Sequence, residues 1–507
     1  MVFHKLKSFV SLTLLSTSAF FLSRTVKSQE TDKAGSEIQT GIPKIAVIGG
    51  GIGGTSCAYF LQELFRDGAE IDVYERGEIG GRIKSIHIAG RDYESGASII
   101  HPRNKYLVQH AAKFGLKHRK KISSLMGAYN GREFVFEESQ WGIITVLKMI
   151  LQYGFMDLWG LRREVNSMLN KFDNIYKLQD EGQSFLTLRD MMHAMGGDDF
   201  VKWTMLPADQ MLREMKFSEK FISEVVSLAT RVNYGQDPDM EGFAASVSLA
   251  GVQSGLWAVE GGNMLLPENF LTQSKATRRS SSVVRVALGQ NSDNVTKPSF
   301  MVTHTDGNRS ETDRYDMVVI ATPLVPGISE IEFVDFPSPI GPFPGEYCST
   351  VATFIDGTLN PKAFGRTKEE GLPDSVITTQ DIPLGIRSVA KNFPVTIEGD
   401  VDKDKFVYKI FSTEKVSGSQ LDALFSSRSE ERSEDWLAYP YYKDVDIDKV
   451  ASFQLHDGIF HVSPIEWAAS AMEMSVIGGK NVALLAKQYW NGLTEENGRT
   501  GIAKDEL

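Results

Sequence analysis

Short apolar runs alternate with longer amphipathic stretches along most of the chain. Residues 44–49 (KIAVIG) and 70–75 (EIDVYE) are β-branched apolar runs, and residues 55–67 between them have apolar positions at helical spacing. A strand, a helix and a second strand in this order indicate a parallel βαβ unit, because central parallel strands are buried on both faces. Further strands are predicted at 315–320 and 458–462. The pattern predicts an α/β fold.

Two other stretches have different patterns. Between 111 and 254 the apolar spacing is mainly helical, and between 336 and 450 short strand patterns alternate with turns that contain proline and glycine. Helices are predicted at 105–117, 141–153, 158–178 and 219–232. The second stretch is expected to form a sheet.

Composition narrows the class of protein. The 507 residues are 42% hydrophobic and 23% charged, which excludes a wholly disordered or fibrous chain. A net charge of −11 without a basic patch argues against nucleic acid as a partner. Cys57 and Cys348 cannot make a disulfide framework and fit no zinc spacing, so they are expected to be unpaired thiols.

Both ends of the chain contain targeting signals. Lys5 and Lys7 precede an apolar run at 9–22, which is the layout of a secretory signal peptide over residues 1–23, with an uncleaved anchor as the alternative. Residues 24–42 are a polar linker. The last four residues, 504–507 (KDEL), are an endoplasmic reticulum retention signal and predict a retrieval receptor as partner.

Two asparagines are expected to be glycosylated if the protein enters the lumen of the secretory pathway. Asn294 and Asn308 each begin an Asn-x-Ser/Thr acceptor sequence in a polar stretch.

A glycine-rich turn follows the first predicted strand and opens the first predicted helix. Gly49 permits the tight turn, Gly51 lets the backbone approach a diphosphate, and Gly53 is a further predicted cofactor-binding residue of the same turn. Gly54 allows close packing of helix on strand, and Glu75, 21 residues further on, can accept hydrogen bonds from ribose hydroxyls. This combination predicts a dinucleotide site.

Residues after the second strand identify the dinucleotide by resemblance. Glu75-Arg76, then GGR at 80–82 and an acid-x-Gly-Ala segment at 94–97, resemble the FAD-binding region of the flavin amine oxidase superfamily. In physical terms Arg82 offers a planar cation to phosphate. The resemblance implies FAD as cofactor, held also by the following residues: Arg76, Gly81, Gly96, Ala97, Ser98, Gly261, Gly262, Ala321, Thr322 and Glu466.

The segment around Glu466 resembles the third flavin segment of the superfamily, with one departure. Glu466 is expected to open a long helix that runs to about residue 489, with its N-terminus directed at the cofactor. The superfamily usually has glycine just before this glutamate, whereas this chain has Pro464 and Ile465. Pro464 has no N–H group, so one backbone donor to the cofactor is absent.

The resemblance implies a Rossmann-type FAD-binding domain that is split in sequence, with an inserted α+β substrate domain. The FAD-binding domain is expected at 43–110, 255–335 and 451–490, the substrate domain at 111–254 and 336–450, and a tail at 491–507.

Several motifs in order along the chain resemble a narrower family. They are SIIHP (98–102), VFEES (135–139), GGDDF (196–200), RVNYGQ (231–236), SGLWAVEGGN (254–263), WLAYP (436–440) and AASAMEMS (468–475). Together they are similar to the prenylcysteine oxidase family over residues 43–495. This implies an FAD-dependent thioether oxidase that converts S-farnesyl- or S-geranylgeranylcysteine, O2 and water into cysteine, prenyl aldehyde and hydrogen peroxide. It also implies a lysosomal address, which conflicts with the retention signal.

No catalytic triad, metal cluster or paired carboxylate stands out, so the cofactor is expected to carry the difficult step. Trp257, His101 and Tyr439 are candidates for the flavin face, although each could instead be structural. Arg231 could meet the substrate carboxylate or form a structural ion pair.

Residues 141–161 form the most apolar stretch after the signal peptide, and Lys148, Gln152 and Asp157 make them a poor spanning helix. Three interpretations stay open: core helices, the lining of a prenyl channel, or peripheral attachment to a membrane surface.

Two other functions stay open. The cofactor segments alone fit an FAD oxidase of another amine or thioether, and they also fit a catalytically silent flavin- or lipid-binding paralogue.

Overall fold

The computed structural model describes residues 41–289, 298–307, 309–397, 406–450 and 452–505. The predicted signal peptide, most of the linker, Asn294, Asn308 and the last two residues lie outside the described residues. Those predictions therefore stay predictions.

A six-stranded sheet forms the centre of the dinucleotide-binding part. Its order is β18 (Gln454–His456), β19 (Ile459–His461), β11 (Met317–Ile320), β1 (Lys44–Ile48), β2 (Glu70–Tyr74) and β7 (Thr277–Arg279). All neighbours pair in parallel except β18 with β19. Ile45, Val47, Val73, Val318 and Val319 are fully buried, as central parallel strands require. The predicted α/β fold with a split Rossmann-type domain is confirmed.

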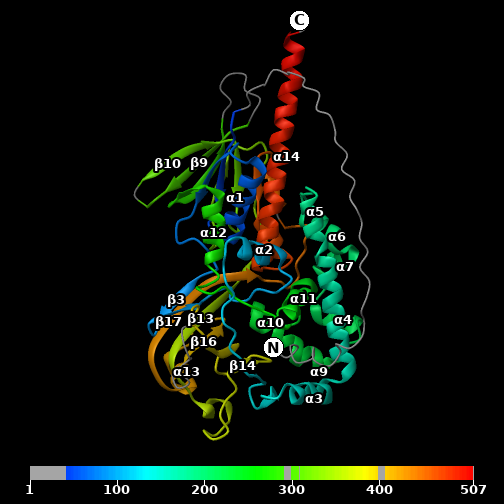
Figure 1. Cartoon of the computed structure of the whole chain (residues 1–507), viewed down its shortest axis with the longest axis vertical. Helices are drawn as coiled ribbons and strands as arrows, with labels where there is room; N and C mark the ends of the chain where they lie inside the picture. The colour runs from blue at the N-terminus through cyan, green and yellow to red at the C-terminus, as the bar shows by residue number, and fades with distance from the viewer. Residues whose placement is uncertain (1–40, 290–297, 308, 398–405, 451, 506–507) are drawn as a thin grey trace.

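The helices that the described residues form in this part are α1 (Ile52–Phe65), α2 (Lys105–Lys113), α12 (Leu265–Ser274) and α14 (Met472–Asp505). In Figure 1, α1, α12 and α14 lie together beside the sheet. Glycines allow their close approach: a Cβ at Gly54 would lie 2.0 Å from Gly49 O, and one at Gly479 of α14 would lie 2.7 Å from Gly53 O. The glycine turn therefore fixes α1 against both β1 and α14.

Two small sheets complete this part. One has the order β10 (Ser310–Tyr315), β9 (Phe300–Thr305), β8 (Ser282–Leu288) and β12 (Glu332–Val334), and the other pairs β3 (Ser85–Ile88) with β4 (Arg91–Glu94).

A seven-stranded sheet forms the second part, at the other end of the molecule from β9 and β10 (Figure 1). Its order is β17 (Phe425–Pro440), β13 (Tyr347–Leu359), β16 (Val407–Ser412), β15 (Ser388–Asn392), β14 (Ser375–Thr378), β5 (Met126–Tyr129) and β6 (Phe134–Glu137). The short helix α13 (Gly418–Leu424) precedes β17. The sheet thus combines strands from both predicted insertions.

The other helices of this part come from the first insertion. They are α3 (Gly142–Tyr153), α4 (Phe155–Phe172), α5 (Asn174–Asp180), α6 (Leu188–Gly196), α7 (Asp198–Trp203), α8 (Ala208–Glu214), α9 (Glu219–Phe221), α10 (Ser227–Tyr234) and α11 (Gly242–Ala250). A π-helical segment at Ile222–Val226 joins α9 to α10. The helix predicted at 158–178 is divided at Asp173, between α4 and α5.

The expectation that Glu466 opens the long C-terminal helix is wrong. Glu466 lies in a 3-10 turn at Ser463–Trp467, and α14 begins only at Met472. The buried Tyr442 hydroxyl donates to Glu466 O (2.8 Å) and accepts from Ser470 N (2.6 Å). It thereby satisfies backbone groups that a continuous helix would have paired with each other.

Cys57 and Cys348 are free thiols, as expected. Within the described part of the chain, no helix combines the length and the apolar character needed to cross a bilayer. No cluster of potential metal ligands occurs among the same residues.

Candidate functional site

One cavity of about 1350 Å³ extends from the glycine turn after β1 to the helices of the second part. It is larger than the ~300–1,000 Å³ of most ligand pockets, so it can hold more than one small molecule. Its walls come from β1, β2, α14, the seven-stranded sheet and the α3–α4 and α10–α11 helices.

The glycine turn makes one end of this cavity. Gly49 has φ +115°, and its N–H donates to Tyr74 O on β2 (2.8 Å). A Cβ at Gly49 would meet the carbonyl of Ala321 at 3.0 Å, whereas a Cβ at Gly51 would meet only Gly80 O, at 4.0 Å. Gly51 therefore leaves open space where it lines the cavity.

Helix α1 begins at this turn with its positive end unneutralised. Its N-cap is Gly51, and its first turn contains no acidic side chain. Backbone N–H groups at such an end, together with the helix dipole, bind anions and above all phosphate.

Glu75 lies beside the turn, directly after β2. Its Oε2 accepts from Gly50 N (2.8 Å) and its Oε1 from Gly77 N (2.7 Å). A carboxylate has about four acceptor positions, so two remain for ribose hydroxyls. A glycine cradle, a bare helix N-terminus and an oriented carboxylate fit the diphosphate and ribose of a dinucleotide.

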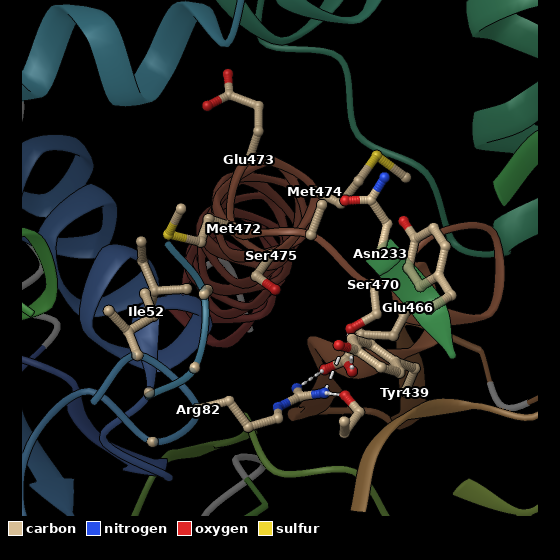
Figure 2. A pocket seen from close by; sticks show the side chains of 18 of the residues that line it. Ile52, Arg82, Asn233, Tyr439, Glu466, Ser470, Met472, Glu473, Met474 and Ser475 are labelled. Atoms are coloured by element: carbon tan, nitrogen blue, oxygen red, sulfur yellow. Dashed lines mark hydrogen bonds and ion pairs between the residues drawn. The ribbon is translucent and has the colours of Figure 1, made fainter. Parts of the chain in front are cut away.

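A polar cluster centred on Arg82 and Glu466 lies further along the cavity (Figure 2). Arg82 Nη2 donates to Glu466 Oε1 (2.7 Å), and Nη1 donates to Ala438 O (2.7 Å) and Ser470 Oγ (3.3 Å). Glu466 Oε2 also accepts from Tyr347 Oη (3.2 Å). Burial acts to lower the pKa of Arg82, but the Glu466 carboxylate has the stronger opposite effect, so the pKa of Arg82 is raised.

This cluster changes what can be expected of Arg82. Three of its five N–H groups already donate to protein acceptors, so few remain for phosphate. The pair instead ties the loop before β3 to the end of β17 and the turn before α14. The sequence predicts Arg82 and Glu466 as two separate cofactor contacts, and no sequence signal indicates that they contact each other.

Most of the predicted site residues do line the cavity. They are Gly49, Gly51, Gly53, Glu75, Arg76, Gly81, Arg82, Gly96, Ala97, Ser98, His101, Ala321, Thr322, Tyr439 and Glu466. Gly54 is not among the lining residues, because it faces Gly49 and Ala321 in the helix–strand contact.

Trp257, Gly261 and Gly262 do not line the cavity either. Trp257 stacks on His118 with ring centroids 3.8 Å apart, and its backbone pairs with Ile100. Gly261 donates its N–H to Val395 O (3.0 Å). Leu256 of this segment lines the cavity, but these three residues do not, so the resemblance to a flavin segment does not bring them to the site.

His101 and Arg231 are both engaged by neighbouring groups. His101 Nδ1 accepts from Arg103 N (3.1 Å), and burial lowers the pKa of the ring. Arg231 is fully buried and lies outside the cavity. Its Nη1 is 2.6 Å from Asp237 Oδ1, and its Nη2 is 2.7 Å from Asp381 Oδ1. It forms the structural ion pair.

The far end of the cavity is apolar. Its lining includes Met126, Phe136, Met149, Tyr153, Met168, Leu169, Phe172, Val225, Leu228, Val232, Val247 and Ile377. Residues 141–153 and 155–172 thus line the cavity with their inner faces. Helical spacing could indicate a buried face, but not that this face borders a cavity.

Lys409 on β16 is a cavity residue that sequence reasoning missed. Its Nζ donates to Glu94 O (2.9 Å) and lies 4.5 Å from the centre of the Phe411 ring. Burial lowers the pKa of Lys409 to about 7, against the opposing effect of Glu94. The sequence around Lys409 did not indicate that its side chain enters a cavity, because a lysine within a strand usually faces solvent.

Replacing Lys409 by methionine should stabilise the protein in a pH-dependent way. Between about pH 7 and the ordinary lysine value of about pH 10.4, the unfolded chain binds more protons than the folded one, so wild-type stability rises with pH. Below pH 7 Lys409 is protonated in both states, so burying its charge lowers the stability of the folded protein by the full amount. We expect Lys409→Met to gain about 2–4 kcal/mol there and little near pH 10, measured by denaturant unfolding across pH.

Lys391→Met is the matched control. Lys391 lies on the adjacent strand β15 and is paired with Asp374 at a partly exposed position (2.9 Å). A pH-independent difference at Lys409, or an equal gain at Lys391, would contradict the assignment of a buried titrating lysine.

Comparisons with known proteins identify relatives over most of the chain. The family model described as Prenylcysteine lyase matches residues 136–498, and that of an NAD(P)-binding Rossmann-like domain matches residues 47–114. Prenylcysteine oxidase 1 of Homo sapiens is 39% identical over 474 residues, covering 92% of this chain and 93% of that protein. Prenylcysteine oxidase 1-like of Bos taurus is 34% identical over 452 residues, covering 88% and 91%.

Solved structures show the same fold at much lower identity. Cyclohexylamine oxidase from Brevibacterium oxydans superimposes with a TM-score of 0.54 and 15% identity, over 89% of this chain and 99% of that one. At this identity the likeness concerns the fold alone.

Proposed function

The chain belongs to the prenylcysteine lyase family, and from this membership and the cavity we propose that it is an FAD-dependent oxidoreductase that cleaves S-prenylcysteine. The products are cysteine, the prenyl aldehyde and hydrogen peroxide, formed with O2 and water. Relatives named prenylcysteine oxidase 1 are 37–39% identical over about nine-tenths of the chain.

The observation that carries the proposal is that one cavity has two chemically different ends. The end at Gly51 and Glu75 fits a dinucleotide, and the other end is lined by methionine, aromatic and aliphatic side chains. A prenyl chain gains free energy by leaving water for such a lining. The two ends are continuous, so a prenyl donor and FAD can lie in one cavity.

The residues that would hold FAD are those of the dinucleotide end. Gly51 and the N-terminus of α1 suit the diphosphate, Glu75 suits a ribose, and Gly96–Ser98 line the path towards the polar cluster. When bound, FAD supplies the two-electron oxidation of the carbon next to sulfur and the reaction with O2.

The chain's own residues orient the donor and limit its contact with water. The apolar wall holds the prenyl chain, which leaves the cysteine part towards the polar residues between the two ends. Among these, Tyr439 packs edge-on against Tyr234, with ring centroids 5.3 Å apart. Burial raises the pKa of Tyr439 to about 12. Its hydroxyl therefore stays protonated at neutral pH and can donate a hydrogen bond.

An anaerobic titration of the purified FAD-loaded protein tests this function. Farnesylcysteine should bleach the visible flavin band in one equivalent, and readmitted O2 should restore it. S-allylcysteine is the matched control donor, because it keeps the thioether, the allylic carbon and the amino acid but lacks the rest of the prenyl chain. It should give at least a tenfold slower response, since it cannot use the apolar end.

Each other outcome would overturn the proposal in a defined way. Bleaching by cyclohexylamine but not by farnesylcysteine would identify an oxidase of another donor. A yellow protein that responds to no donor would identify a catalytically silent flavin-binding paralogue.

We also propose that the protein works in the lumen of the secretory pathway as a glycoprotein. The support is the signal-peptide pattern, the acceptor sequences at Asn294 and Asn308, and the C-terminal KDEL. The retention signal favours the endoplasmic reticulum, and the family resemblance favours the lysosome. Fractionation of cells that express the chain with and without the last four residues distinguishes the two, and an unglycosylated cytosolic protein would contradict both.

A further inference from the structure

An unusually apolar surface is formed by the outer side of α3 and the start of α4. Its exposed side chains, here called the apolar face, are Trp141, Ile143, Ile144, Leu147, Leu151, Phe155, Met156 and Trp159. Leu151 is 86% exposed and Trp141 73%. Other exposed large apolar side chains of the described residues are scattered singly along the chain between Ile42 and Tyr441. A contiguous patch of this kind marks an interaction surface.

The sequence of α3 makes the helix apolar on two opposite sides. Ile143, Leu147 and Leu151 recur every four residues and face outward, whereas Met149 and Tyr153 are four residues apart and face the core. Burying the inner side therefore cannot cover the outer one. Gly154, with φ +82°, ends α3 and starts α4 at once, which keeps the two apolar segments together.

The charges around the apolar face are mainly positive, although the whole chain has a net charge of −11. Lys148 and Arg162 are exposed, and neither pairs with a carboxylate of the described residues. The Arg163 guanidinium lies over the Trp159 ring, with Cζ 4.9 Å from the ring centroid, and it is also paired with Glu164.

Of the two acidic side chains in α3 and α4, Glu164 is paired with Arg163 and Asp157 is turned away from solvent. Asp157 is buried and bonded to Ser218 N (3.3 Å). Tryptophans and cations around an apolar stripe suit the surface of an anionic bilayer, and no described helix is able to span one.

We propose that the apolar face attaches the protein to the surface of membranes that contain anionic phospholipid. In Figure 1, α3 lies at the end of the molecule opposite the C-terminal end of α14, so the bulk of the protein does not shield it. The face enters the headgroup region with its leucines, isoleucines and aromatic rings, while Lys148 and Arg162 meet lipid phosphates.

The attachment has a consequence for the substrate, which rests on the proposed function. The inner sides of the same helices line the apolar end of the cavity, through Met149, Tyr153, Met168, Leu169 and Phe172. Two helices thus separate the bilayer from the binding place of the prenyl chain. A prenylated amino acid partitions into bilayers, so attachment by this face shortens its path to the cavity.

Vesicle sedimentation with the full chain tests the attachment without any need for turnover. Wild-type protein should sediment with vesicles of phosphatidylcholine and phosphatidylserine. Leu151→Ser/Phe155→Ser should lower the partition coefficient by about tenfold or more, because both side chains leave the headgroup region. Lys148→Gln/Arg162→Gln should lower it about tenfold on these vesicles and little on pure phosphatidylcholine.

The matched control is Leu186→Ser/Met205→Ser, which removes two exposed apolar side chains outside the apolar face. This control should bind like wild type. Comparing variants of one chain cancels any contribution from other segments. Equal binding of the Leu151/Phe155 variant and wild type would overturn the proposal, and so would absence of wild-type binding.

Two further measurements separate the remaining explanations. If wild type is a dimer by sedimentation velocity and the Leu151/Phe155 variant a monomer, with no vesicle binding by either, the face joins two copies and the lipid proposal fails. Oxidation of monomeric farnesylcysteine in solution should be unchanged in this variant, since neither residue lines the cavity. Absence of farnesylcysteine oxidation by wild-type protein that still binds the vesicles would count against the proposed function alone.

Discussion

Gly51→Leu should give a folded but colourless protein. Gly51 has φ −70° and ψ 177°, which any residue adopts, and a Cβ there meets no protein atom closer than 4.0 Å. The leucine would instead occupy the space at the N-terminus of α1 where the diphosphate is expected. We expect at least a hundredfold loss of FAD affinity, read as flavin absorbance per protein and by titration with FAD, and a far-UV circular dichroism spectrum like that of wild type.

Two other glycines serve as controls for this prediction. Gly418 at the start of α13 also has open space around it, so Gly418→Leu should keep both fold and colour. At Gly54 a Cβ would lie 2.0 Å from Gly49 O, so Gly54→Leu should fail to fold rather than only lose FAD. A yellow Gly51→Leu protein with normal stoichiometry would show that the diphosphate does not lie at this turn.

The sequence allowed the dinucleotide end to be predicted in detail because local rules determine it. A turn of this tightness needs glycine at Gly49 and Gly54, and the acid at the end of β2 follows at a fixed separation. Each requirement concerns residues that are close in sequence or on adjacent strands, so the pattern of types and spacings is informative.

Long-range contacts were not predictable in the same way. Tyr442 satisfies the backbone on both sides of the break between Glu466 and Ser470, and nothing near Glu466 in sequence reveals it. Lys409 reaches the cavity because β16 lies within a sheet built from two insertions. Trp257 beside two glycines resembled a flavin segment, yet its ring stacks on His118. Such placements depend on which strands pair, and single-sequence patterns leave that open.

Breaking the Arg82–Glu466 pair should destabilise the protein and loosen the cavity wall. Glu466 is almost completely buried, Arg82 is one-third exposed, and the two join three separate segments of the chain. Removing one partner of a buried pair costs about 3–5 kcal/mol, and the exposure of Arg82 reduces this to about 2–3 kcal/mol. Glu466→Gln and Arg82→Gln should each lower the free energy of unfolding by this amount in excess FAD.

The double variant distinguishes an ion pair from two independent contacts. If the charges interact, Arg82→Gln/Glu466→Gln should be more stable than the sum of the single losses by about 2 kcal/mol, because neither variant then leaves an unpaired buried charge. The same double-variant cycle on the exposed pair Arg428–Asp422, with 2.7 Å between Nη2 and Oδ1, should give a coupling energy below about 1 kcal/mol. Equal coupling at both pairs would mean that Arg82 is as well solvated as a surface arginine. Its remaining N–H groups would then again be available to a phosphate, which the closed geometry of the cluster argues against.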